Sequence, residues 1–203
     1  LQEYKRFYNA TNLFLVIAGD FDEDQVIDAC EASFKGLKPG APRAGRPPIL
    51  PEPFKGRDGR KTFRHHTSPD ALLHLGWLGI DGAHADNAAL DAFALILGQG
   101  ESSRLTRKLV HDLRLVRDIG AGSWSPKERG YFGVSMRGPS GTGAKFGSII
   151  DAIEECLRAP VSEAELDKAK KNLLSSAVYS KETVDGLAQR FGYYESIASN
   201  WEL

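Results

Sequence analysis

The spacing of apolar residues along the chain predicts several short strands. Residues 131–137 alternate most clearly, with Phe132, Val134 and Met136 on one face. Residues 13–18 form a continuous apolar run rich in branched side chains, bounded by an asparagine and a glycine, which predicts a buried strand. Three further extended segments are predicted at residues 61–67, 71–78 and 118–124.

Helical spacing of apolar residues fills most of the remaining chain. Two helix starts are well marked, because Asp22 with Gln25 and Ser162 with Glu165 follow the capping-box pattern. The predicted helices cover residues 22–34, 87–97, 104–113 and 146–157, a segment that opens at Ser162, and residues 183–196. This order of elements predicts an α+β fold, a mainly antiparallel sheet with helices packed on one face.

The run Gly-Gln-Gly-Glu-Ser-Ser-Arg-Leu joins two of these predicted helices. Its motif residues are Gly98, Gly100, Ser102, Ser103, Arg104 and Leu105. We expect Gly98 to end the first helix in the left-handed conformation, and the Ser102 or Ser103 hydroxyl to cap the second. For Arg104 we expect a structural role at the helix start rather than contact with a substrate.

Together with two other segments, this run resembles the pitrilysin/insulinase family of zinc metallopeptidases, the inverzincins. The other two are Tyr-Asn-Ala-Thr-Asn-Leu-Phe-Leu-Val-Ile-Ala-Gly-Asp-Phe-Asp at residues 8–22 and Val-Ser-Glu-Ala-Glu-Leu-Asp-Lys-Ala-Lys at residues 161–170. The similarity is to the region that follows the zinc-binding domain. It implies the repeating sheet-and-helix domain of the pitrilysin and mitochondrial-processing-peptidase type metallohydrolases.

The resemblance also implies a division of the chain. Residues 1–38 correspond to the helix-strand-helix tail of the preceding peptidase domain, and residues 39–58 form a Pro/Gly-rich linker. Residues 59–203 correspond to the second, non-zinc domain, truncated at its C-terminus. We therefore expect the chain to be a fragment, in which residues 13–18 pair with the sheet of residues 61–137, within one chain or exchanged between two.

The zinc motif of the family, His-x-x-Glu-His on a helix, does not occur in this sequence. The five histidines are His65, His66, His74, His84 and His111, and none is paired with another at the i, i+4 spacing. At most one of the two adjacent histidines could join His74 across neighbouring strands, so solvated or core-rim positions are favoured. Cys30 and Cys156 both lie in helical patterns and are interpreted as buried thiols rather than a disulfide. We expect no catalytic residue, metal or cofactor in this chain, and zinc in the parent protein.

In the family, the half without zinc often supplies an Arg and a Tyr, seven residues apart, that bind the substrate carbonyl. The matching positions here are Val110 and Arg117, so that pair is missing. Arg117 is the single candidate for contact with substrate, although a solvated cation is the favoured interpretation of it. The departure implies either a zinc-bearing chain whose partner half, in a homo- or heterodimer, supplies the pair, or a degenerate paralogue.

The composition and charge of the chain argue against two classes of partner, nucleic acid and the membrane interior. A chain of 203 residues with 41% hydrophobic and 26% charged residues can bury a core as an ordinary globular protein. The 26 Lys and Arg balance 27 Asp and Glu, which gives no basic field for nucleic acid, and no apolar run approaches the roughly 20 residues of a membrane span. The sequence is compatible with the bacterial cytoplasm, the periplasm or an organelle as its compartment.

The resemblance predicts a non-catalytic domain of a zinc-dependent endopeptidase, forming part of the wall of a peptide-enclosing chamber. Its expected partners are a peptide or unfolded-protein substrate and the zinc-bearing domain upstream. One alternative is a non-catalytic scaffold or assembly subunit of the same fold. Another is a small-molecule-binding α+β module.

Overall fold

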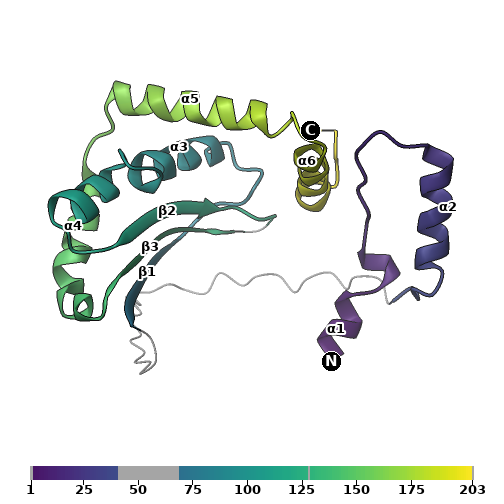
Figure 1. Cartoon of the computed structure of the whole chain (residues 1–203), viewed down its shortest axis with the longest axis horizontal. Coiled ribbons are helices and arrows are strands. Elements are labelled where there is room, and N and C mark those ends of the chain that lie inside the picture. The colour runs from purple at the N-terminus through teal and green to yellow at the C-terminus, as the bar shows by residue number, and fades with distance from the viewer. Residues whose placement is uncertain (1, 41–68, 128, 203) are drawn as a thin grey trace.

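A computed structural model describes residues 2–40, 69–127 and 129–202 (Figure 1). The N-terminal elements are α1 (Gln2–Phe7), η1 (Ala10–Asn12) and α2 (Glu23–Phe34). The remaining elements are β1 (Asp70–Leu78), α3 (Asn87–Gly98), η2 (Thr106–Asp112), β2 (Asp118–Trp124), β3 (Tyr131–Pro139), η3 (Ser140–Lys145), α4 (Phe146–Arg158), α5 (Glu163–Tyr179) and α6 (Val184–Ala198).

The three strands form one antiparallel sheet in the order β1-β3-β2. Helices α3 and α4 cover one face of it, and α5 lies over α3 on the outside (Figure 1). The predicted α+β fold, with an antiparallel sheet and helices on one face, is thus confirmed. The predicted pairing of the strands at residues 61–67 lies outside the described residues.

The core lies between β3 and the helices. Phe132, Val134 and Met136 alternate along β3 and are all buried, as the sequence pattern predicts. The other members of this buried cluster are Ala94, Leu97, Leu105, Leu109, Val116, Ile119, Ala121, Ile149, Ala152, Ile153 and Cys156. A smaller cluster of Ala92, Ile96 and Ala169 joins α3 to α5. No described helix combines the length and apolarity needed to cross a membrane.

Residues 13–18 do not form the buried strand that we expected. They are extended, but within the described residues their backbone joins no strand of the sheet, and Leu13, Phe14 and Leu15 are about half exposed. The run instead lies beside α6, where a Cβ on Gly192 would sit 3.9 Å from Cγ2 of Val16. The apolar pattern indicates side chains that favour burial, but it does not determine which segment of the protein covers them.

Candidate functional site

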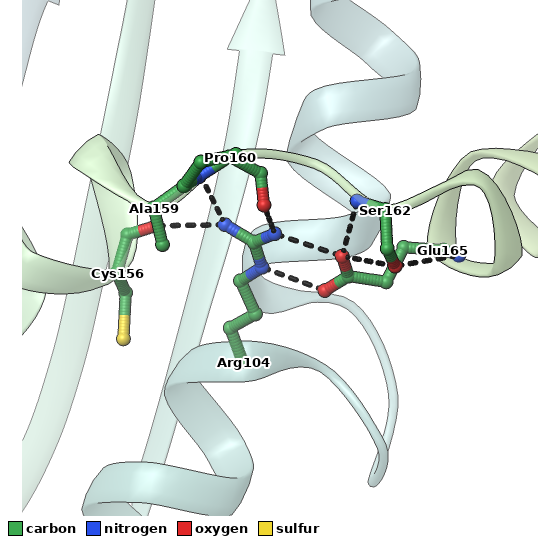
Figure 2. A network of polar contacts seen from close by, with 6 residues as sticks. All are labelled: Arg104, Cys156, Ala159, Pro160, Ser162 and Glu165. Atoms are coloured by element: carbon green, nitrogen blue, oxygen red, sulfur yellow. Dashed lines mark hydrogen bonds and ion pairs between the residues drawn. The ribbon is translucent and has the colours of Figure 1, made fainter.

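The guanidinium of Arg104 holds the connection between α4 and α5 (Figure 2). It donates to both carboxylate oxygens of Glu165, from Nε to Oε1 at 2.7 Å and from Nη2 to Oε2 at 2.8 Å. It also donates to three backbone carbonyls, those of Cys156 at 3.1 Å, Ala159 at 2.8 Å and Pro160 at 2.7 Å. We call this arrangement the Arg104 clamp.

Pro160 explains why a side-chain donor is needed at this place. In a continuing α-helix the Cys156 carbonyl would accept from the N–H four residues later, but that residue is a proline and has no N–H. Nη1 of Arg104 donates to this carbonyl instead. A planar fork with five N–H groups suits one carboxylate and several carbonyls, whereas a lysine could not span them in the same way.

Glu165 belongs to the clamp and to the capping box that opens α5. Its Oε2 accepts from the Ser162 backbone N–H at 2.9 Å and from the Ser162 hydroxyl at 2.8 Å. The hydrogen bonds from Arg104, followed by that from the Ser162 backbone, lower the pKa of Glu165 to about 2. The hydrogen bond with Glu165 in turn raises the pKa of Arg104. The pair is therefore ionised throughout the neutral pH range.

The other motif residues are structural, although three of them, Gly98, Ser102 and Ser103, act differently from our expectation. Gly98 is the last residue of α3 and is not left-handed; the positive φ, 86°, belongs to Gly100. A Cβ on Gly98 would lie 2.2 Å from the backbone N of Ala121, so this glycine is required for the close approach of α3 to β2. The motif thus combines a packing glycine with a separate turn glycine.

Neither serine of the motif caps η2. Ser102 accepts a hydrogen bond from Lys168 of α5, and the buried Ser103 donates to the Thr106 hydroxyl at 2.9 Å. Leu105 is fully buried in the core. The segment that follows, predicted as an α-helix, is wound as the π-helix η2, with the Leu113 N–H bonded to the Lys108 carbonyl.

The sheet face opposite the helices is uncovered by any element of the described residues, and we call it the open face. Three glycines from the three strands, Gly76, Gly133 and Gly122, lie side by side across it. A Cβ on Gly76 or Gly122 would meet no atom within 4 Å. A Cβ on Gly133, between them, would lie 3.1 Å from Cε2 of Tyr131, so the ring of Tyr131 covers the middle of the row. Another backbone could therefore approach the sheet closely at the two outer glycines, Gly76 and Gly122.

Apolar and polar rows flank these glycines. On one side lie Leu78, Tyr131 and Trp124, all more than half exposed, with the rings of Trp124 and Tyr131 5.8 Å apart. On the other side, His74 Nδ1 and the Ser135 hydroxyl form a hydrogen bond of 2.8 Å. Exposed aromatic rings beside a flat polar strip are features of surfaces that contact polypeptide.

The charged end of the open face holds the substrate-facing candidate from the sequence. Arg117 precedes β2, is 59% exposed and pairs with Asp70 through a contact of 2.6 Å from Nη1 to Oδ1. Next to it, Arg137 pairs with Asp118 at 2.9 Å. Val110, at the other family position, is half-buried in η2. The structure therefore places Arg117 in an ion pair and not among catalytic groups.

The described histidines lie apart from one another. His74 contacts Ser135, His84 contacts Asp86, and His111 contacts Glu101 at 3.0 Å. His65 and His66 lie outside the described residues. Within the described ranges no three His, Cys, Asp or Glu side chains gather where they could hold a metal ion. Cys30 and Cys156 are both free thiols, and burial raises the pKa of Cys156.

Sequence reasoning missed two features of this site. The first is the ion pair of Arg104 with Glu165, which are 61 positions apart in the chain. Two features of the sequence pointed to it: the glutamate of the capping box, and the carbonyl of Cys156 that the missing N–H of Pro160 leaves without a helical donor. The glycine row was detectable as Gly76, Gly122 and Gly133 at non-core positions of three predicted strands. Each strand alone gave no sign that the three would lie in register.

Comparisons with known proteins agree with this geometry. The chain is 26% identical over 205 residues to the zinc protease PqqE of Helicobacter pylori, covering 96% of this chain and 45% of that protein. The crystal structure of a protease from Helicobacter pylori superposes with a TM-score of 0.69 at 25% identity, over 91% of this chain and 45% of that one. A chain of Complex III2 from Candida albicans shares the fold, with a TM-score of 0.65 at 20% identity, over 90% of this chain and 44% of that one.

The chain thus spans less than half the length of the zinc protease that it matches. The family model that matches residues 1–173 is the peptidase M16 inactive domain. This match confirms the resemblance seen in the sequence, and it agrees with a non-catalytic role. The chain belongs to the peptidase M16 family and represents its inactive domain.

Proposed function

We propose that this chain is the non-zinc part of a zinc metalloendopeptidase and forms one wall of a chamber that encloses a peptide. The observation that carries the proposal is the open face, with its glycine row between an aromatic row and a polar row. An extended peptide could lie across the glycines while its side chains contact Trp124 and Tyr131. A wall of this kind excludes water and positions the substrate without a catalytic group of its own.

The proposal assigns residues 1–38 to the end of the preceding domain and residues 39–58 to a linker, although most of the linker lies outside the described residues. Residues 59–203 form the second domain. The exposed, extended run at residues 13–18 supports this division. Its backbone pairs with no strand in the part of the chain that the structure describes, and its apolar side chains are about half exposed, so strands from the preceding domain would complete it. The zinc-bearing domain upstream would supply them, together with the zinc and its chemistry.

A partner half, as a second copy or a related chain, would supply the Arg and Tyr that Val110 and Arg117 do not match. A scaffold role is the second candidate, and it is favoured by the shared fold with the Complex III2 chain. The two candidates differ in one respect. The peptidase requires a peptide in contact with the open face, whereas a scaffold does not.

Photo-cross-linking of a peptide to the whole protein tests the proposal. A peptide that carries a benzophenone group is bound to the zinc-depleted protein and irradiated, and the labelled residues are mapped by mass spectrometry. We expect labels on Trp124, Tyr131 and Leu78. Labels confined to the outer surface of α5, or none above those given by a scrambled competitor in excess, would reject the chamber-wall role.

A further inference from the structure

A hollow lies at the opposite end of α3 from the Arg104 clamp. It has a volume of about 490 Å³, is open to solvent on one side, and is bordered by the first turns of α3, the connection from β2 to β3, and the C-terminal half of α6. Figure 1 shows α6 beside this end of the sheet. We call it the α6 cavity. It borders the open face, with which it shares Trp124.

Two oxygen atoms of residues that line this cavity have no hydrogen-bond partner among the described residues. Asn87 donates through Nδ2 to the carbonyls of Asp81 at 3.3 Å and Gly82 at 2.8 Å, which fixes its amide and leaves Oδ1 as the free acceptor. This Oδ1 and the Ser125 Oγ are both buried and unpaired within the described part of the chain. Leaving a buried polar atom unsatisfied costs about 1–3 kcal/mol, so an occupant with hydrogen-bond donors is expected.

An anion and two aromatic rings line the same cavity. The Asp91 carboxylate accepts a hydrogen bond from the Ser123 hydroxyl and stays exposed to solvent. Trp124 and Tyr193 present rings that are 58% and 51% exposed. Burial, then Tyr194, then Asp91 raise the pKa of Tyr193, which indicates that this carboxylate lies near the phenol.

This set of groups matches one ligand chemistry. Oxygen acceptors satisfy N–H donors, a carboxylate attracts a positive charge, and aromatic faces attract a cation. We propose that the α6 cavity binds a small organic ammonium group, from a free amine or from the amino group of a polypeptide. Lys127 is the one cationic residue among the described residues that line the cavity.

Titration of the 203-residue chain with n-butylammonium tests this inference. The signal is the indole N–H resonance of Trp124 in a nitrogen-15 NMR spectrum, with Trp77 and Trp201 as internal references. n-Butanol is the neutral probe of matched shape, and glycinamide represents a peptide amino group. We expect a saturable shift of the Trp124 resonance with n-butylammonium or glycinamide, the tighter of the two identifying the source, and none with n-butanol.

Matched variants complete the test. Asp91→Asn keeps the shape of the side chain but removes its charge, and we expect it to weaken binding at least about fivefold. Asp86→Asn removes a carboxylate from the same end of α3 outside the cavity and should bind as the wild type does. If Asp91→Asn does not fold, Tyr193→Leu, which removes a ring, serves instead. Three results would overturn the proposal. They are a titration that does not saturate, as expected if the cavity holds only water, an equal response to n-butanol, and unchanged binding by the folded variant.

Discussion

Arg104 and Glu165 form a two-point ion pair that joins the start of η2 to the start of α5, across 61 positions of the chain. Arg104 is the better buried partner, with 14% of its side chain exposed against 33% for Glu165. Because the same guanidinium also binds three carbonyls after α4, one side chain fixes how α4, α5 and the motif run are arranged. The motif residue that the sequence drew attention to is therefore an architectural residue.

The substitution Arg104→Lys should destabilise the fold although it keeps the charge. Lysine loses the two-point contact with Glu165 and cannot reach the carbonyls of Cys156, Ala159 and Pro160 together. We expect the free energy of unfolding to fall by about 2–4 kcal/mol in urea denaturation. Arg107→Lys, at an exposed position of η2, is the control and should leave stability within about 0.5 kcal/mol. Equal stability of the two variants would show that the clamp is not structural.

Glu165 should make stability depend on pH in the acid range. Its folded pKa of about 2 lies below its ordinary value of 4.5, so the ionised form is favoured by folding. The contribution is complete above pH 4.5 and is lost as the pH falls toward 2. We expect the free energy of unfolding of Glu165→Gln at pH 7 to be about 1–3 kcal/mol lower than that of the wild type, a range that allows for the partial exposure of Glu165. Between pH 4.5 and 2, the stability of the variant should decrease less steeply than that of the wild type. Parallel stability curves for the two proteins over that interval would contradict this account.

Much of the fold could be predicted from the sequence because its elements carry local signals. The alternation in β3, the segment of β2 and the capping box at Ser162 depend on neighbouring residues, and all three appear in the structure as predicted. The partners of Arg104 and the register of the glycine row depend on contacts between distant segments, which periodicity does not encode. The conformation of Gly98 could not be predicted for a related reason, since its role is set by Ala121 across the helix–sheet interface.

The capping box predicts the cost of removing the Ser162 hydroxyl. Ser162 Oγ accepts from the Glu165 backbone N–H at 3.4 Å and donates to its carboxylate at 2.8 Å. Ser162→Ala removes both contacts and should lower the free energy of unfolding by about 0.5–2 kcal/mol. Ser176 in α5 is exposed, and its hydroxyl has no hydrogen bond among the described residues, so Ser176→Ala serves as the matched control in chemical denaturation. No difference between the two variants would mean that the cap contributes nothing.

Gly98→Ala should be strongly destabilising for a helical glycine. The new methyl group would overlap the backbone N of Ala121 at 2.2 Å and its Cβ at 2.7 Å, and neither atom can move without displacing β2. We expect a loss of about 1–3 kcal/mol or more. Gly147→Ala in α4, where a Cβ meets nothing within 4 Å, should be neutral or slightly stabilising. A thermal melt of each variant separates these outcomes, and equal melting temperatures would refute the close approach of α3 to β2.

The chamber-wall role of the open face is the central claim, and peptide hydrolysis by the whole protein tests it most directly. Gly122→Val fills the glycine row with a side chain, whereas Gly141→Val adds the same side chain on η3, and in both positions a Cβ meets no atom within 4 Å. At equal zinc content, we expect kcat/KM for a peptide to fall at least about tenfold in Gly122→Val and to stay unchanged in Gly141→Val. Equal kcat/KM for the two variants would contradict the claim that substrate lies on this face.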